Sequence, residues 1–176
     1  EDMLDIHHAG TAMRFLTAYL AATTQKEITL TGSPSMCQRP IGPLVAALRD
    51  MGAAITYTGA QGYPPLKIAP ATLSSDATID AGMSSQYISA LLLIAPSLQN
   101  GLELELIGEI TSASYINMSL KLLQEIGVKT SFVGNLIIVK PKSQDQKPKT
   151  IIVESDWSSV SYFYSIIALS IEGTKI

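Results

Sequence analysis

The sequence predicts a mixed α/β (α+β) fold built from repeated βαβαββ units, and three observations support this prediction. The chain repeats itself, because AGTAMRFLTAYL at residues 9–20 aligns with AGMSSQYISALL at residues 81–92. Further on, LTGSPSMCQRPIGPL at residues 30–44 aligns with LIGEITSASYINMSL at residues 106–120. Both copies then enter a helix that ends in glycine, and a third copy begins at SDWSSVSYFYSIIALSIEGTKI.

The first unit carries a signal for each of its elements. Met13, Leu16 and Leu20 are spaced as one face of a helix, and the strand-like EITLTG follows. Pro40 is predicted to open a second helix, since proline suits the first helical position, and Gly52 is predicted to close it. The apolar face of that helix is Ile41, Leu44, Val45 and Leu48. The strands AAITYT and PLKIAP complete the unit.

The second unit shows the same order of signals. A strand at ATID precedes a helix at about residues 84–95, and the alternating LELELIG forms the next strand. A helix at about residues 115–126 leads to the strands VKTSFV and LIIVKP. The unit is therefore predicted to be βαβαββ, twice over.

A linker is predicted at KPKSQDQKPKT, residues 140–150, which is polar and contains two prolines. We divide the chain there. Residues 1–145 hold the two units of a first domain, and residues 146–176 hold a crossover linker and the first strand and helix of a second domain. The apolar YFYSIIALSI needs a partner, so either more of a second domain covers it or it packs back onto the first.

Composition excludes several classes of protein. Of the 176 residues, 47% are hydrophobic and 15% are charged, which is typical of a globular protein with a core. A net charge of −3, without a basic run among aromatics, argues against nucleic acid. The apolar runs are too short for a membrane span, and the acidic EDMLDIHHAG does not resemble a signal peptide. The single cysteine, Cys37, fits a reducing compartment, so we expect a cytoplasmic protein.

The arginines divide into one expected and two unexpected positions. Arg49, in LRDMG, lies where the C-terminus of a helix favours a cation. Arg14 and Arg39 lie at or beside predicted helix starts, where the helix dipole disfavours positive charge. Arg39 directly precedes Pro40, and a phosphate or carboxylate ligand would explain it. The alternative is an exposed arginine paired with a local acid.

Each copy of the repeat has a short polar turn leading into a helix, namely AGTAMR, AGMSSQ and SDWSS. Helix N-termini bind anions readily, and Ser84 and Ser85 could either cap a helix or donate hydroxyls to a phosphate. Arg14 matches Gln86 in the repeat, as Arg39 matches Tyr115. Four long hydrogen-bonding side chains at matching positions predict one shared cleft.

Other reactive side chains lack a recognisable pattern. His7 and His8 are adjacent and would point to opposite faces of a strand, so we expect no metal site there. Cys37 is interpreted as a loop thiol. The sequence holds no nucleophile elbow, P-loop or dinucleotide fingerprint. Asp80 and Asp156 are interpreted as turn or helix-end residues, with Asp156 left open as a general base.

An ordered series of motifs covers almost the whole chain. It consists of HAGTAMRFL, SMCQRPIGPLVAALRDMGA, YPPLKI, GMSSQYISALLL and SYINMSLKLLQEIGV. This series resembles the 5-enolpyruvylshikimate-3-phosphate (EPSP) synthase family, the 3-phosphoshikimate 1-carboxyvinyltransferases. The resemblance implies an enolpyruvyl transferase-like inside-out α/β barrel, with three βαβαββ units in each of two domains and substrates bound between the domains. The chain would be a part of such an enzyme, inactive in isolation.

The resemblance also implies roles for particular residues. The shikimate 3-phosphate contacts would be Ser84, Ser85, Gln86, Ser112 and Tyr115. The phosphoenolpyruvate contacts would be Gly10 through its backbone, Arg39 and Gln86, in the loop that also binds glyphosate in the family. The loop would be supported by Thr11 and Arg14. Two residues depart from the family pattern: His8 stands where asparagine is usual, and Phe15 where proline is usual.

The implied reaction transfers the enolpyruvyl group of phosphoenolpyruvate to the 5-hydroxyl of shikimate 3-phosphate, with release of phosphate. The resemblance assigns no catalytic acid or base to this chain, and implies no metal, no organic cofactor and a monomeric complete enzyme. Three alternatives stay open. They are a UDP-N-acetylglucosamine enolpyruvyl transferase, a non-catalytic anion-binding module, and a purely structural repeat protein.

Overall fold

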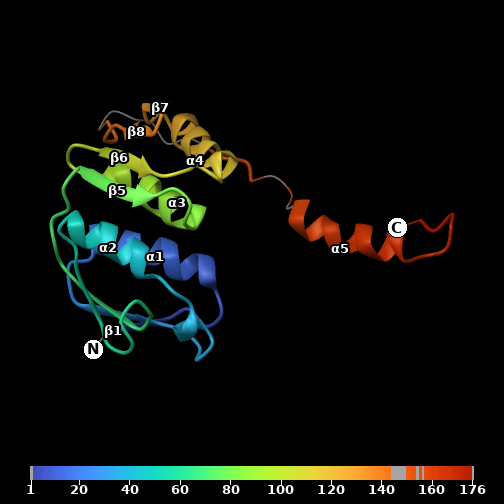
Figure 1. Cartoon of the computed structure of the whole chain (residues 1–176), viewed down its shortest axis with the longest axis horizontal. Coiled ribbons are helices and arrows are strands. Elements are labelled where there is room, and N and C mark those ends of the chain that lie inside the picture. The colour runs from blue at the N-terminus through green and yellow to red at the C-terminus, as the bar shows by residue number, and fades with distance from the viewer. Residues whose placement is uncertain (1, 144–149, 154, 156, 176) are drawn as a thin grey trace.

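The computed structural model describes residues 2–143, 150–153, 155 and 157–175. Two four-stranded sheets and four helices make up a compact body, and a fifth helix stands apart from it (Figure 1). The first sheet contains β1 (Asp2–Asp5), β2 (Ile28–Thr31), β3 (Ala54–Tyr57) and β4 (Leu66–Ala69). The second sheet contains β5 (Asp76–Asp80), β6 (Leu102–Ile107), β7 (Thr130–Val133) and β8 (Leu136–Val139). The helices are α1 (Gly10–Thr23), α2 (Gly42–Asp50), α3 (Ser85–Ile94), α4 (Ala113–Glu125) and α5 (Trp157–Ala168), with 3-10 turns η1 (Met36–Gln38) and η2 (Ala95–Ser97).

Both sheets have the same topology, which confirms the repeated βαβαββ unit. Their strand orders are β1-β2-β4-β3 and β5-β6-β8-β7. In each sheet the first two strands are parallel and are joined through a helix, while the last two form an antiparallel hairpin. We call β1 to β4 with α1 and α2 unit one, and β5 to β8 with α3 and α4 unit two.

The core lies where the helices of the two units meet. Each sheet buries one face, as β6 shows: Leu102, Leu104 and Leu106 are buried, and Glu103 and Glu105 between them are exposed. α3 packs against both α1 and α4, and from Tyr87 to Ile94 every residue except Leu93 is buried. The side chains at the start of α3 are therefore held on a rigid element at the centre of the molecule.

The start of α2 differs from the sequence prediction. Pro40 does not open the helix; α2 begins at Gly42, and Pro43 takes the position in the first turn that proline favours. The reason is that Ile41 is not helical, with φ −137° and ψ 1°, and its N–H donates to the carbonyl of Gly62. Arg39 consequently lies three residues before the helix, in extended backbone at the end of η1.

The C-terminus of α2 agrees with the prediction. Arg49 lies in the last turn, and its guanidinium donates two hydrogen bonds, of 2.9 and 2.7 Å, to the carbonyl of Ile55. Gly52 follows with φ 105°, and Gly127 follows α4 with φ 90°. Both glycines take the left-handed conformation that ends a helix, so the predicted helix ends are confirmed in both units.

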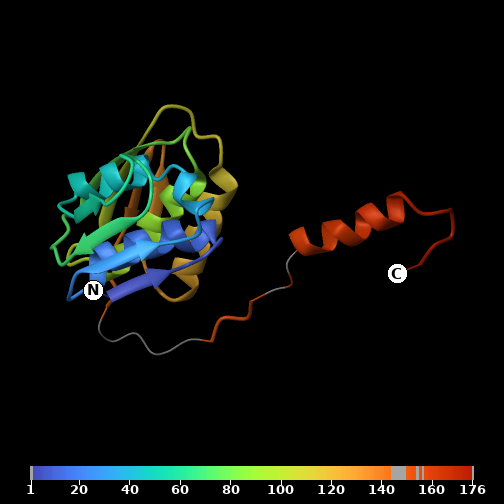
Figure 2. The same ribbon diagram turned by 90° about the horizontal axis from the view of Figure 1, so that it is seen from below.

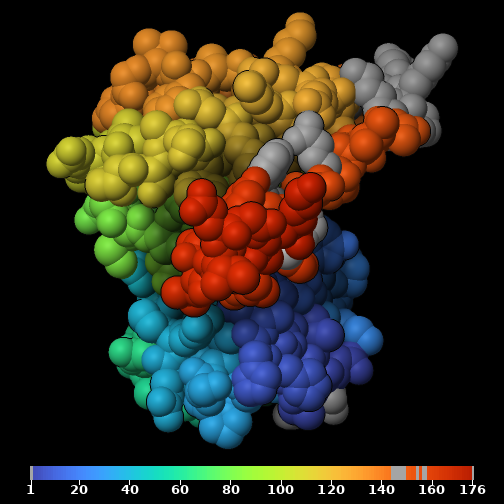
Figure 3. Space-filling model, turned by 90° about the vertical axis from the view of Figure 1, so that its right-hand side faces the viewer, coloured from blue at the N-terminus to red at the C-terminus, as the bar shows by residue number. Residues whose placement is uncertain are grey.

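The third copy forms its helix, α5, but the strand expected before it is not formed at residues 150–153. Figures 1 and 2 show α5 clear of the two units, and Figure 3, seen from the side on which α5 lies, shows it in front of them. Its large apolar side chains are exposed, among them Tyr162, Phe163 and Ile166. The helix therefore does not pack back onto the first units. The domain boundary expected at residues 145–146 and most of the expected linker lie outside the described residues.

Within the described ranges, no helix is long and apolar enough to cross a bilayer.

Candidate functional site

The loop between β1 and α1 begins with a turn made by Asp5. The Asp5 carboxylate accepts a hydrogen bond of 2.8 Å from the N–H of His7, which ends the strand. His7 and His8 therefore lie in a turn and not on a strand, and His7 has φ 50°. The Nδ1 atom of His8 lies 2.9 Å from the hydroxyl of Ser33. In the described part of the chain, no three His, Cys, Asp or Glu side chains are grouped to hold a metal ion.

Gly10, the first residue of α1, lies where two arginines approach the helix N-terminus. A Cβ built on Gly10 would lie 2.5 Å from Nη1 of Arg39 and 3.3 Å from Nη1 of Arg14. Arg14 also donates to the carbonyl of Gly10. Arg39 is exposed, and its side chain has no hydrogen bond or ion pair within the residues that the structure describes. The alternative of a paired surface arginine is therefore not observed there.

Gln86 connects this loop to unit two. Nη1 of Arg14 donates to Oε1 of Gln86 at 2.7 Å, and Nε2 of Gln86 donates to Oγ1 of Thr11 at 3.1 Å. Arg14 and Gln86 occupy matching positions in the repeat, and the structure joins them directly. The prediction that matching side chains share one location is thus confirmed for this pair.

A cavity of about 580 Å³ opens beside Gln86, between α1, α3 and α4. Its polar end contains Thr11, Ser84, Ser85, Gln86 and Tyr115, all of them predicted site residues. The rest of the lining is Phe15, Ser89, Leu93, Met118, Ser119 and Leu122. Carboxylates are absent from this lining, so an anion would meet no direct repulsion.

Ser84 and Ser85 stand at the N-terminus of α3 with their hydroxyls available. Ser84 is the N-cap residue, but its side chain makes no capping hydrogen bond. Among the described residues, neither hydroxyl has a hydrogen-bond partner. The interpretation of these serines as caps alone is therefore not supported, and both hydroxyls can add to the backbone N–H groups at the positive end of the helix.

Four predicted residues lie outside the cavity lining, namely Gly10, Arg14, Arg39 and Ser112. Ser112 is the N-cap of α4, and its carbonyl accepts the N–H of Tyr115, so it lies next to the rim. Arg39 lies beside Gly10, which is also outside the lining. Asp80 is confirmed as a turn residue, because its carboxylate accepts the N–H of Gly82 at 2.8 Å. Asp156, left open as a base, lies outside the described residues.

Tyr87 was not among the predicted site residues, yet its hydroxyl donates to the carbonyl of Pro40 at 2.8 Å. Its ring lies below the guanidinium of Arg14, with Cζ 5.7 Å from the ring centroid. The signal was present in the repeat, because Tyr87 matches Phe15 and differs from it by the hydroxyl.

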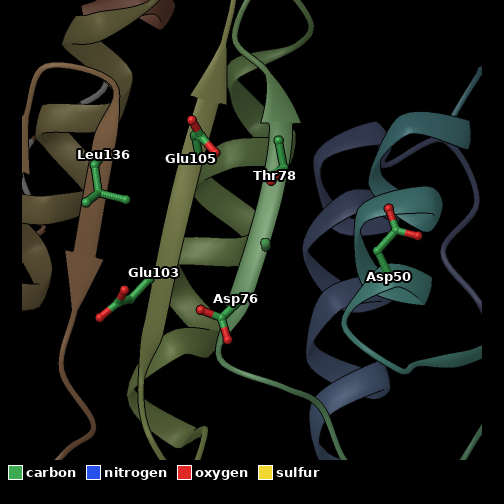
Figure 4. Close-up of a pocket in the computed structure, with 7 residues that line it drawn as sticks. Asp50, Asp76, Thr78, Glu103, Glu105 and Leu136 are labelled. Carbon is green, nitrogen blue, oxygen red and sulfur yellow. The ribbon is translucent and has the colours of Figure 1, made fainter.

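A second hollow lies on the outer face of the second sheet, and its charges exclude it as an anion site. Figure 4 shows Asp76 and Thr78 on β5, Glu103 and Glu105 on β6, and Asp50 on α2 around it. The hollow measures about 340 Å³. Four carboxylates would repel a phosphorylated ligand, whereas the cavity beside Gln86 has no carboxylate in its lining and is the better candidate of the two.

Comparisons with known proteins match the same family. The sequence profile described as EPSP synthase (3-phosphoshikimate 1-carboxyvinyltransferase) matches residues 1–176. The chain belongs to the EPSP synthase family. The 3-phosphoshikimate 1-carboxyvinyltransferase of Bacteroides fragilis (strain YCH46) is 50% identical over 171 residues, which cover 96% of this chain and 41% of that protein. The protein of the same name from Pasteurella multocida (strain Pm70) is 42% identical, over 94% of this chain and 39% of the relative.

The fold agrees with a solved EPSP synthase. The structure of the Acinetobacter baumannii enzyme superposes with a TM-score of 0.67 at 25% identity, covering 81% of this chain and 31% of that one. This likeness confirms the predicted α/β class and the enolpyruvyl transferase-like units. The chain spans about two fifths of the length of the EPSP synthases that it matches, 41% for the Bacteroides fragilis protein.

Proposed function

We propose that this chain forms part of an enzyme that transfers the 1-carboxyvinyl group of phosphoenolpyruvate to the 5-hydroxyl of shikimate 3-phosphate, with release of phosphate. The names of the relatives support this reaction. The single observation that carries the proposal is the bonded junction of Arg14, Gln86 and Thr11, which joins the starts of α1 and α3 at one cavity. Two anionic substrates need two neighbouring anion-binding sites, which we call anion seats. One is proposed at the start of α1 and the other at the start of α3, and this junction lies next to both.

Shikimate 3-phosphate is assigned to unit two. Its phosphate would accept hydrogen bonds from the hydroxyls of Ser84 and Ser85 and from the N–H groups at the start of α3. Gln86 and Tyr115 line the same cavity and can contact the polar ring of the substrate, with Ser112 at the rim. The remaining lining includes the apolar side chains of Phe15, Leu93, Met118 and Leu122.

Phosphoenolpyruvate is assigned to unit one. The guanidinium of Arg39 and the N-terminus of α1 at Gly10 supply positive charge at one place. Thr11 and Arg14 hold Gln86 between the two substrates. In the reaction, the 5-hydroxyl attacks C2 of phosphoenolpyruvate as C3 is protonated, after which phosphate leaves and the double bond re-forms. The preorganised donors would stabilise charge as it develops.

The division into domains is part of the same proposal. Residues 1–145 would supply two of three units of a first domain, and residues 146–176 would enter a second domain that supplies the catalytic acid and base. The exposed apolar side chains of α5 support the need for such a domain. The single cysteine supports a cytoplasmic location, and we take the complete enzyme to be a monomer.

The alternative of a non-catalytic anion-binding module describes this chain taken alone. Tyr115 is the titratable side chain in the cavity lining, and a tyrosine by itself does not supply both an acid and a base. We therefore expect the isolated chain to bind shikimate 3-phosphate weakly and to turn over neither substrate.

The test is release of inorganic phosphate from phosphoenolpyruvate by the complete gene product. We expect release that depends strictly on shikimate 3-phosphate and is not supported by UDP-N-acetylglucosamine. Release without that dependence, or with the UDP-sugar as acceptor, would contradict the proposal. Ser85→Ala should raise KM for shikimate 3-phosphate and Arg39→Ala should raise KM for phosphoenolpyruvate, each about tenfold, since each removes a charge-assisted hydrogen bond.

A further inference from the structure

Tyr87 connects the two proposed substrate seats. It lies in the first turn of α3, directly after Gln86, and only 3% of its surface is exposed. Its hydroxyl reaches across to unit one and donates to the carbonyl of Pro40 at 2.8 Å. Among the described residues, the side-chain hydrogen bonds between the units all involve Gln86 or its neighbour Tyr87.

The acceptor of this bond lies next to the arginine assigned to phosphoenolpyruvate. Pro40 follows Arg39, and the proline ring fixes the local backbone, so a bond to the Pro40 carbonyl restrains the residue before it as well. The Arg39 side chain has no partner of its own within the described residues. Its position over Gly10 therefore depends on its backbone, and Tyr87 is the side chain that ties this backbone to α3.

The ring of Tyr87 has a separate contact. The guanidinium of Arg14 lies over it at 5.7 Å, and the same guanidinium donates to Gln86. Phe15, at the matching position of unit one, packs against the core with a ring and no hydroxyl. A ring without a hydroxyl is thus sufficient for packing at this position. The hydroxyl of Tyr87 serves the hydrogen bond to the carbonyl of Pro40.

We propose that Tyr87 is a positioning residue whose hydroxyl holds the Arg39 loop in register with Gln86, and so sets the spacing of the two anion seats. This inference rests on the proposed function. It predicts a selective effect, because the hydroxyl restrains the loop of unit one while Ser84 and Ser85 are carried by α3 itself.

The experiment is Tyr87→Phe in the complete protein, assayed by steady-state phosphate release. We expect KM for phosphoenolpyruvate to rise about threefold to tenfold, the range that the loss of one hydrogen bond gives. KM for shikimate 3-phosphate and kcat should change by less than about twofold on the same grounds. An unchanged KM for phosphoenolpyruvate, or an equal rise of both KM values, would overturn the inference.

Tyr57→Phe is the matched control. Tyr57 also lies under an arginine, with Cζ of Arg49 4.8 Å from its ring centroid, but Arg49 is not one of the two arginines at Gly10. We expect neither KM to change in this variant. A rise in the control as large as that of Tyr87→Phe would show a general loss of packing and would overturn the inference.

A double variant tests whether the hydroxyl acts through Arg39. If it does, Tyr87→Phe in an Arg39→Ala background adds nothing further to KM for phosphoenolpyruvate, whereas independent effects would multiply. Multiplying effects would overturn the inference. A wild-type enzyme without release that depends on shikimate 3-phosphate would instead reject the proposed function, so the two failures are distinguishable.

Discussion

The two units have the same topology, but their first helices begin at different positions of the sequence repeat. β1 and β5 each end in an aspartate whose carboxylate accepts the N–H two residues later, at 2.8 Å in both units. That residue is His7 in unit one and Gly82 in unit two. The sequence repeat, however, aligns Gly82 with Gly10. α1 therefore begins earlier than α3 relative to the repeat, and this earlier start places Gly10 inside a helix.

The two helix starts proposed to bind anions carry different side chains. At α1 they are two arginines, which suit a small anion of high charge density. At α3 they are serine hydroxyls and an amide, beside a cavity large enough for a ring. Under the proposed function, one repeated unit with a positive helix N-terminus in each copy would hold two unlike substrates side by side.

The largest expected difference between the two units is the loss of activity when a methyl group is added at Gly10 and at the matching Gly82. In Gly10→Ala, the new Cβ would lie 2.5 Å from Nη1 of Arg39, so the guanidinium must move away. Because small displacements of a positioning group are costly, we expect kcat/KM for phosphoenolpyruvate to fall about 100-fold. In Gly82→Ala the new Cβ meets a carboxylate oxygen of Asp80 at 3.2 Å, and a small shift relieves this contact. A comparable loss in Gly82→Ala would contradict the distinction between the two starts.

A smaller effect, on stability, is expected at two buried hydroxyls that occupy matching positions in the two units. Thr17 in α1 matches Ser89 in α3; the Thr17 hydroxyl donates to the carbonyl of Met13 in its own helix, while the Ser89 hydroxyl accepts from Ser119 of α4 at 2.8 Å. Ser119→Ala leaves Ser89 buried without this partner. We expect the free energy of unfolding to fall by about 1 kcal/mol, as measured by urea denaturation.

Thr17→Val is the control for that measurement. The acceptor of the Thr17 hydroxyl is a helix carbonyl, so we expect a loss below about 0.5 kcal/mol. A loss at Thr17 equal to that at Ser119 would show that the two units bury their hydroxyls equivalently, contrary to the hydrogen bonds observed.

Local patterns were sufficient to predict most of the fold. Alternation in LELELI and the glycines after α2 and α4 act within a few residues, so the strands and helix ends follow from them. The predicted start of α2 at Pro40 was wrong because the N–H of Ile41 donates to the carbonyl of Gly62, a partner twenty-one residues away. The prediction that His7 and His8 lie on a strand was wrong for a local reason. The Asp5 carboxylate accepts the N–H of His7, which would otherwise be available to the sheet.

The candidate site could be predicted in part. Matching positions in the repeat indicated that Arg14 and Gln86 belong together, and they are bonded. Tyr87 was missed because an aromatic residue at a core spacing predicts packing alone. The repeat shows that Tyr87 has a hydroxyl that Phe15 lacks, but it does not show that this hydroxyl contacts Pro40. Contacts between units depend on how the units pack, which local patterns do not specify.

The central claim is that Gln86 joins two anion seats into one site, and Gln86→Ala in the complete enzyme tests it most directly. We expect KM for both phosphoenolpyruvate and shikimate 3-phosphate to rise, each about tenfold, because the amide lies between the seats. Gln124→Ala is the control, since Gln124 also donates to a threonine hydroxyl, that of Thr130, but on the exposed side of α4. The account predicts a rise in both KM values for Gln86→Ala alone. A rise for only one substrate, or for neither, would contradict it.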